Sequence, residues 1–215
     1  MEKIFAIGDI HGCLFKLEQL ISLLRNRIDR EKDTLLFIGD YIDRGPDPKG
    51  VVDFVLDLRN YFARAVFLLG NHEEMFLNYI NGRNGGYMFF MNGGDATAAS
   101  YGSQDPQGRG VIEVPKDHME FFTTLLPSYE TEDYIFVHAG LRPGMPLAEQ
   151  AKEDLLWIRY EFIRSSYNFG KTIVFGHTPL LEPLIERNKI GIDTGAVYGG
   201  PLTCVELPAQ RIYQV

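Results

Sequence analysis

The chain has 215 residues, 45% of them hydrophobic, which is enough apolar surface for one sizeable core. Its 21 Lys and Arg against 29 Asp and Glu give a formal net charge of −8, which argues against a nucleic-acid-binding protein. Two cysteines are too few for a disulfide framework, and neither a signal-peptide pattern nor a membrane-spanning apolar run is present, so we expect a single cytoplasmic domain over residues 1–215.

Three consecutive strand, loop and helix units are predicted in the first 80 residues. In each unit an apolar strand runs into a polar loop, and the helix that follows has apolar residues at helical spacing. The strands are predicted at 3–7, 34–38 and 65–69, and the helices at 14–28, 50–60 and 71–80. Such units imply parallel strands with helical crossovers, so their polar loops share the carboxyl edge of one sheet, where ligands bind.

Residues 81–115 interrupt this rhythm with repeated Gly and Asn, and we expect a long surface excursion with one short helix over 95–101. Strands without a helix between them are usually antiparallel, so the C-terminal part is expected to form mostly a second sheet. Helices are predicted at 116–126 and 148–166, and strands at 134–137, 172–175, 184–186, 190–192, 202–206 and 211–215.

Acidic residues, an asparagine and histidines lie in the loops that follow the predicted strands. They are Asp9, His11, Asp40, Asp43, Asn71, His72, His138 and His177. Carboxylate oxygen and imidazole nitrogen form a ligand set that suits Mn, Fe, Zn or similar divalent ions. Because polar groups at the ends of buried strands are costly to desolvate, their number is explained if they converge on metal ions.

Five short motifs in a fixed order resemble the signature of the PPP-type metallophosphatases. They occupy residues 8–12, 39–45, 70–73, 138–140 and 176–177. One such motif alone is weak evidence, whereas five in order are specific. The resemblance implies the calcineurin-like metallophosphoesterase fold, which is an α+β fold with two mixed sheets in a sandwich flanked by helices.

The resemblance also implies two divalent metal ions, with manganese expected and iron, zinc or cobalt as alternatives. A hydroxide that bridges the two ions would attack phosphorus directly, without a phosphoenzyme. The first metal would be held by Asp9, His11 and Asp40, and the second by Asp40, Asn71, His138 and His177. Asp40 would therefore bridge the pair.

Further roles follow from the same resemblance. His72 would protonate the leaving oxygen, and Asp43 would hold its other ring nitrogen. Arg44 and Arg159 would bind phosphate oxygens, as would Asn71 beside the metals.

Other residues near the motifs have simpler interpretations. His118 belongs to no motif and is expected on a helix surface, while Trp157 is expected to pack. Glu73 is expected to support the metal ligands from behind, without binding metal. Residues 92–94 are equally consistent with a simple turn and with a substrate groove, and Tyr198 is expected to pack, with a substrate contact as the alternative.

The resemblance predicts a phosphomonoesterase that acts as a serine/threonine protein phosphatase on a phosphorylated protein or peptide, with no nucleic-acid or membrane partner and an undetermined oligomeric state. The alternative is a symmetrical diadenosine tetraphosphate hydrolase with the same fold and metals. That branch has Ala in place of Asp43 and Asp in place of Glu73, so this chain favours the protein phosphatase. An oriented acid helps to expel an alkoxide, whereas a nucleotide phosphate leaves readily without it.

Two rival classes share parts of this pattern. A nucleic-acid phosphodiesterase on the same metal centre is disfavoured by the acidic charge balance. A scaffold that binds partners without catalysis would have lost at least one metal ligand, and all six residues proposed as ligands are present.

Overall fold

The structure is a computed structural model that describes residues 2–83, 85–103 and 112–215. The N-terminal elements are β1 (Ile4–Ile7), α1 (Leu14–Leu24), β2 (Thr34–Phe37), α2 (Pro48–Tyr61), β3 (Ala65–Phe67), α3 (Asn71–Ile80), α4 (Gly85–Met91), α5 (Gly94–Ser100) and α6 (Lys116–Thr124). They are followed by β4 (Ser128–Glu130), β5 (Tyr134–Val137), the 3-10 turn η1 (Leu147–Glu149), α7 (Lys152–Trp157), α8 (Tyr160–Ile163), β6 (Thr172–Phe175), β7 (Leu184–Ile185), β8 (Lys189–Gly191), the 3-10 turn η2 (Ala196–Tyr198), β9 (Thr203–Leu207) and β10 (Arg211–Gln214).

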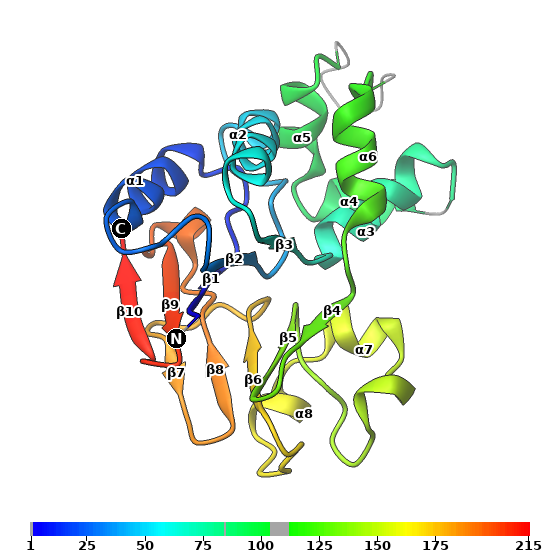
Figure 1. Cartoon of the computed structure of the whole chain (residues 1–215). Coiled ribbons are helices and arrows are strands. Elements are labelled where there is room, and N and C mark those ends of the chain that lie inside the picture. The colour runs from blue at the N-terminus through cyan, green and yellow to red at the C-terminus, as the bar shows by residue number, and fades with distance from the viewer. Residues whose placement is uncertain (1, 84, 104–111) are drawn as a thin grey trace.

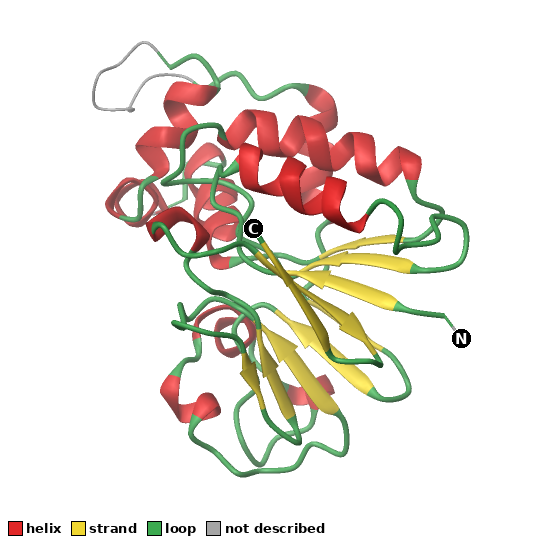
Figure 2. Ribbon diagram, turned by 90° about the vertical axis from the view of Figure 1, so that its left-hand side faces the viewer, coloured by secondary structure: helices red, strands yellow, loops and turns green. Residues whose placement is uncertain are grey.

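Within the described residues, two five-stranded sheets pack face to face with helices outside (Figures 1 and 2). The first sheet has the order β10-β9-β1-β2-β3, in which β1, β2 and β3 are parallel and the C-terminal pair is antiparallel. The second has the order β4-β5-β6-β8-β7, with β5, β6 and β8 parallel and an antiparallel strand at each edge. Both sheets are therefore mixed, which confirms the expected sandwich.

Apolar cores separate these layers, and most strands contribute to two of them. In β1, Phe5 and Ile7 pack under the helices α1 to α6, whereas Ala6 between them points into the core shared by the two sheets. A third core joins the second sheet to α7 and α8, where Ile173 packs with Phe162. Burial on both faces fixes the register of the central strands, and it thereby fixes where the loops at their ends emerge.

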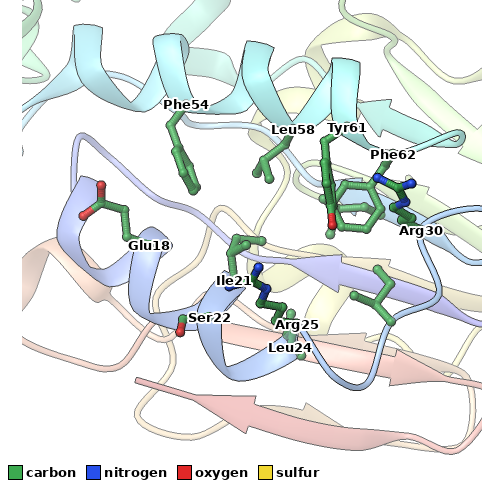
Figure 3. Close-up of a pocket in the computed structure, with 12 residues that line it drawn as sticks. Glu18, Ile21, Ser22, Leu24, Arg25, Arg30, Phe54, Leu58, Tyr61 and Phe62 are labelled. Atoms are coloured by element: carbon green, nitrogen blue, oxygen red, sulfur yellow. The ribbon is translucent and has the colours of Figure 1, made fainter.

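A groove of about 450 Å³ lies between α1 and α2, as Figure 3 shows. Its floor is apolar, with Phe54 and Leu58 from α2 facing Ile21 from α1, and Arg25 and Arg30 lie at its rim. None of the residues predicted to bind metal or phosphate lines it. In the described part of the chain, no helix combines the length and hydrophobicity that a bilayer crossing requires.

The C-terminal half differs from the prediction in three respects. The last two strands, β9 and β10, join the first sheet beside β1, so they are not part of the second sheet. Strands β6 and β8 are parallel although no helix lies between them, because the antiparallel strand β7 carries the chain back. The helix predicted over 148–166 is broken, since Arg159 has φ −128 and ψ −108, outside the helical region, and separates α7 from α8.

The excursion is more ordered than its glycine content suggests. Most of its described part is helical, with α4 and α5 joined at Gly93, and α4 packs against α3. The helix expected over 95–101 is α5, whereas α4 and the strand β4 were not predicted. Residues 104–111 of the excursion lie outside the described part.

Candidate metal centre

The predicted site residues follow the carboxyl ends of strands. Asp9 and His11 follow β1; Asp40, Asp43 and Arg44 follow β2; Asn71 and His72 follow β3; His138 follows β5; and His177 follows β6. Among the described residues, six non-glycine residues have a positive φ, and five of them belong to this set: His11, Asp40, Asp43, Arg44 and His177. Such conformations are costly for residues with a Cβ, and they persist where the surroundings impose them, which is common at functional sites.

Glycines allow the loops to approach one another this closely. A Cβ on Gly70 would overlap Oδ1 of Asp40, and a Cβ on Gly176 would overlap Oδ1 of Asp9. The backbone after β3 therefore lies against one carboxylate and the backbone after β6 against another.

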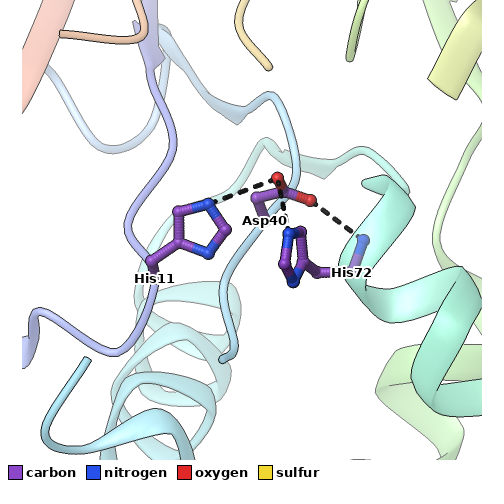
Figure 4. Close-up of side chains that lie close together, drawn as sticks. All are labelled: His11, Asp40 and His72. Carbon is purple, nitrogen blue, oxygen red and sulfur yellow. Dashed lines mark hydrogen bonds and ion pairs between the residues drawn. The ribbon is translucent and has the colours of Figure 1, made fainter. Parts of the chain in front are cut away.

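Two groups of potential metal ligands meet at Asp40. One contains His11, Asp40 and His72, and the other contains Asp40, His138 and His177; within each group the ligand atoms lie within 4.8 Å of one another, and all five residues are buried. His11 Nε2 lies 3.4 Å from Asp40 Oδ2, and His138 Nε2 lies 3.4 Å from Oδ1. Figure 4 shows His11 and His72 pointing toward the Asp40 carboxylate. This is the arrangement expected of a carboxylate that bridges two ions.

The hydrogen bonds made by Nδ1 of His11 and of His138 leave Nε2 of each neutral ring unprotonated, with a lone pair that could bind metal. Nδ1 of His11 donates to the carbonyl of Ile42 at 2.9 Å, and Nδ1 of His138 donates to the carbonyl of Ile38 at 2.9 Å. Burial lowers the pKa of His11 to about 3, and burial likewise lowers the pKa of His138, so both rings are neutral at pH 7. A backbone carbonyl that fixes the tautomer in this way is typical of metal-binding histidines.

Lone pairs converge in the second group. The unprotonated Nε2 of His138 lies 2.9 Å from Oδ1 of Asn71, and Oδ1 of Asn71 is also 3.0 Å from Nδ1 of His177. Three buried side-chain atoms of the described residues have no hydrogen-bond partner, and two of them, Asp9 Oδ1 and His177 Nε2, belong to predicted metal ligands. A cation would compensate facing acceptors and an orphaned carboxylate oxygen, so the donor set fits divalent metal.

Asp9 lies at the edge of this cluster. It belongs to neither group, and its Oδ2 accepts the backbone N–H of His177 at 2.9 Å. Burial and the charges of Asp193 and Asp40 raise its pKa well above the usual value, because three carboxylates share one buried region. The structure therefore brings all six predicted metal ligands together, and it places His72 beside His11 in one of the two groups around Asp40.

His72 and Asp43 form the predicted pair. Nδ1 of His72 donates to Oδ2 of Asp43 at 2.6 Å, and Nε2 of His72 faces Asp40 at 4.0 Å. Both side chains are buried. The sequence prediction missed Thr97 of α5, whose hydroxyl donates to Oδ1 of Asp43 at 2.6 Å.

The two predicted phosphate-binding arginines differ in position. Nη1 of Arg44 lies 2.7 Å from Nε2 of His11, so its guanidinium touches a predicted metal ligand. Nη1 of Arg159 donates to the carbonyl of His177 at 2.9 Å and to Thr178 Oγ1 at 3.3 Å. Trp157 packs edge-on against His177 with ring centroids 5.9 Å apart, which is the packing contact expected of it.

Glu73 organises the loops behind the metal ligands, as predicted. Its carboxylate accepts four backbone N–H groups: those of Asp40 at 2.9 Å, Tyr41 at 2.8 Å, Ile42 at 3.3 Å and Gly70 at 3.1 Å. One side chain thus ties the loop after β2 to the start of α3. The segment at 92–94 is also a support, because the carbonyl of Gly93 accepts the backbone N–H of Arg44 at 3.0 Å.

The expectation for His118 was wrong. His118 is only 1% exposed, and its ring bridges the Tyr101 hydroxyl at 2.7 Å and the Asp53 carboxylate at 2.9 Å. Its spacing of three and four residues from Phe121 and Phe122, which are both buried, is the sequence signal that places it on the inner face of α6.

The fold and the two groups of ligands around Asp40 define a metallophosphoesterase. Residues 2–208 match the family described as calcineurin-like phosphoesterase, so the chain belongs to this family. It is 28% identical over 234 residues to the asymmetrical bis(5'-nucleosyl)-tetraphosphatase PrpE of Oceanobacillus iheyensis, an alignment that covers 99% of this chain and 92% of the relative.

Two solved structures share the fold. One is a protein proposed to be a diadenosine tetraphosphatase, with a TM-score of 0.76, 24% identity and coverage of 100% of this chain and 93% of that one. The other is the cold-active protein-tyrosine phosphatase of a psychrophilic Shewanella, with a TM-score of 0.70, 17% identity and coverage of 100% and 77%. Because the same fold carries both names, the fold by itself does not choose the substrate.

Proposed function

We propose that this protein is a two-metal hydrolase of bis(5'-nucleosyl) tetraphosphates, with residues 1–215 acting as one catalytic domain. The observation that supports the chemistry is the position of the Asp40 carboxylate, which belongs to both groups of potential metal ligands. The substrate class rests on a relative that matches nearly the whole chain and is named an asymmetrical tetraphosphatase. We therefore propose unequal products, a nucleoside monophosphate and a triphosphate, in place of the symmetrical cleavage considered as the alternative.

A pair of divalent cations at this site would lower the pKa of a water molecule toward neutrality and neutralise charge on the phosphoryl oxygens. We propose manganese as the native metal, because carboxylate, amide and imidazole ligands together suit it. The proposed ligands of one ion are Asp9, His11 and Asp40, and those of the other are Asp40, Asn71, His138 and His177.

The remaining residues act on the substrate in this proposal. Arg44 binds the oxygens of the attacked phosphoryl group, since its guanidinium already lies at the edge of the ligand cluster. Arg159 extends the positive charge toward the remaining phosphates. His72 gives the proton on Nε2 to the oxygen that leaves, and Asp43 stabilises its charged form through Nδ1. The bond that breaks joins the α-phosphorus to the oxygen bridging it to the next phosphate.

One observation favours a second candidate, a phosphomonoesterase that acts on phosphorylated protein. Asp43 orients His72, the proposed acid, through a hydrogen bond of 2.6 Å. A poor leaving group such as a serine alkoxide needs a well-oriented acid to protonate it. Such an acid does not hinder the departure of a nucleotide phosphate, so Asp43 is compatible with both substrates.

The products formed from diadenosine tetraphosphate distinguish asymmetrical cleavage from symmetrical cleavage and from protein phosphatase activity. The manganese-loaded protein is incubated with this substrate in ¹⁸O-labelled water, and the nucleotides are resolved by ion exchange and mass spectrometry. We expect equal amounts of AMP and ATP, with the label in AMP, because water attacks the α-phosphorus. Formation of two molecules of ADP would show that cleavage is symmetrical and would contradict the proposed asymmetrical cleavage. Turnover of a phosphoserine peptide without any turnover of the dinucleotide would overturn the proposal in favour of the second candidate.

A further inference from the structure

Tyr198 is an exposed aromatic residue beside a buried polar site. It ends the 3-10 turn η2 and is 64% exposed, in contrast to Ala196 at the start of the turn, which is buried. Its ring centroid lies 5.7 Å from the guanidinium carbon of Arg44. Because Arg44 in turn contacts His11, Tyr198 is two contacts away from the proposed metal ligands. The packing role expected for this residue does not account for a ring that is mostly in solvent.

The turn that presents Tyr198 is held at both ends. Gly195 and Gly199 flank it with φ 69 and 91, and the N–H of Tyr198 donates to the carbonyl of Gly195 at 2.9 Å. Lys16 of α1 donates to the carbonyls of Ala196, at 3.1 Å, and Gly200. An exposed ring on a braced turn loses little conformational freedom when a ligand packs on it, so it suits a binding role.

The neighbourhood of the ring determines what it can bind. A phosphoryl group held by Arg44 would lie next to the Tyr198 ring, because the guanidinium carbon is 5.7 Å from the ring centroid. In a nucleoside 5'-phosphate only the sugar separates that group from a flat aromatic base. Every nucleobase has a π-face, and stacking on an aromatic side chain strengthens binding by about 5- to 150-fold. A phosphoserine side chain offers no such surface.

We infer that Tyr198 is the residue on which the base of the attacked nucleoside stacks, and that it thereby selects nucleotides over other phosphate esters. The inference rests on the proposed function and deepens it by assigning the base next to the α-phosphate to a particular side chain. It predicts tolerance toward adenine, guanine and pyrimidines, because stacking reads the face of a base and not its edge.

Affinity for two ligands that differ only in the base tests this role without turnover. AMP and ribose 5-phosphate are titrated calorimetrically into the manganese-loaded protein and into Tyr198→Ala, Tyr198→Trp and Tyr61→Ala. We expect the intact protein to bind AMP about 10-fold more tightly, and Tyr198→Ala to abolish that difference while its affinity for ribose 5-phosphate stays within about 2-fold. Tyr198→Trp keeps the preference. Tyr61→Ala, which removes an equally large exposed ring from α2, keeps it too.

Kinetics give the second readout. Tyr198→Ala is expected to raise KM for diadenosine tetraphosphate about 10-fold and to change kcat by less than about 3-fold. A preference for AMP that survives in Tyr198→Ala overturns the role of Tyr198, whatever the enzyme hydrolyses. Equal loss of both ligands also overturns it, because the ring would then act by placing Arg44. An intact protein that prefers AMP yet leaves the dinucleotide uncleaved contradicts the proposed function alone.

Discussion

Thr97 donates its hydroxyl proton to Oδ1 of Asp43 at 2.6 Å, and the same hydroxyl oxygen accepts the backbone N–H of Asp43 at 2.9 Å. The two residues are 54 positions apart, and both are fully buried. Asp43 holds His72 through its other oxygen, so a residue of α5 fixes the orientation of the proposed acid. The glycine-rich excursion, which contains α5, therefore supports the proposed His72–Asp43 pair directly.

Removing this hydroxyl is expected to weaken the acid without removing it. Thr97→Val keeps the volume of the side chain but leaves Oδ1 and the N–H of Asp43 without their partner, so the carboxylate loses its fixed position. We expect kcat to fall about 10-fold on an alkyl phosphate, which needs a proton on its leaving oxygen, and less on p-nitrophenyl phosphate.

Thr97→Ser is the matched control, because it restores the hydroxyl in a smaller side chain. Its kcat on the alkyl phosphate is expected to lie within about 2-fold of the intact protein. A uniform loss on both substrates in Thr97→Val would mean that the residue matters only for the fold. Steady-state rates of each variant on the two esters, at equal manganese, make the comparison.

Asp40 is expected to control metal content at both positions. Asp40→Asn retains the shape of the side chain but loses the charge that neutralises two cations, so both ions should bind weakly. We expect elemental analysis to find fewer than two metals per chain after dialysis and activity to fall by at least about 10³-fold. Asp57→Asn on α2 serves as a control for handling. Full metal content and activity in Asp40→Asn would exclude a bridging role.

The ligand loops were predictable because their signals are local. Gly-Asp at the end of an apolar strand marks both the turn and the polar side chain, and the spacing of the helix that follows identifies the crossover. Asp9, His11 and Asp40 were placed on this basis, and the structure brings them together. Gly70 and Gly176 are needed because a Cβ at either position would overlap the carboxylate of Asp40 or Asp9.

The remaining features depend on partners that are distant in sequence. The pairing of β9 with β1 joins Ile4 to Leu207, and nothing in either strand specifies which sheet β9 enters. The break at Arg159, whose side chain donates to the carbonyl of His177, has no local signal either, since the local sequence is compatible with a continuous helix. Thr97 carries no local mark of its role, because its partner Asp43 comes from another motif.

Glu73 is expected to contribute to stability through the four backbone N–H groups that it accepts. Glu73→Gln replaces one acceptor oxygen by an amide that donates, so at least one pair of donors then faces another donor. We expect the free energy of unfolding to fall by about 2–4 kcal/mol, because two buried N–H groups lose their acceptor.

Urea denaturation in the presence of EDTA measures this effect without a contribution from bound metal. Glu74→Gln is the matched control, since the side chain of this next residue forms an ion pair with Lys152 at 2.9 Å whose loss should cost at most about 1 kcal/mol. Equal destabilisation by the two variants would contradict the bracing role given to Glu73.

Glu206 makes part of the stability depend on pH at a place far from the metal ligands. Burial alone would raise its pKa, but the hydrogen bond from the Tyr213 hydroxyl at 2.6 Å, with Lys3 at 3.3 Å and Arg211 at 3.6 Å, lowers the pKa below the ordinary value of 4.5. A carboxyl group whose pKa is lower in the folded state stabilises the fold above 4.5, and this contribution is lost as the pH falls through the folded value.

Glu206→Gln is therefore expected to lower the free energy of unfolding by about 1–2 kcal/mol at pH 7, and by less at pH 3, because the contribution of the charge falls as the pH drops below 4.5 toward the folded pKa. Urea denaturation at the two pH values gives the difference, with the exposed Glu120→Gln on α6 as a control that should change little at either. A deficit in Glu206→Gln that is as large at pH 3 as at pH 7 would show that shape and packing, and not the charge of Glu206, make the contribution.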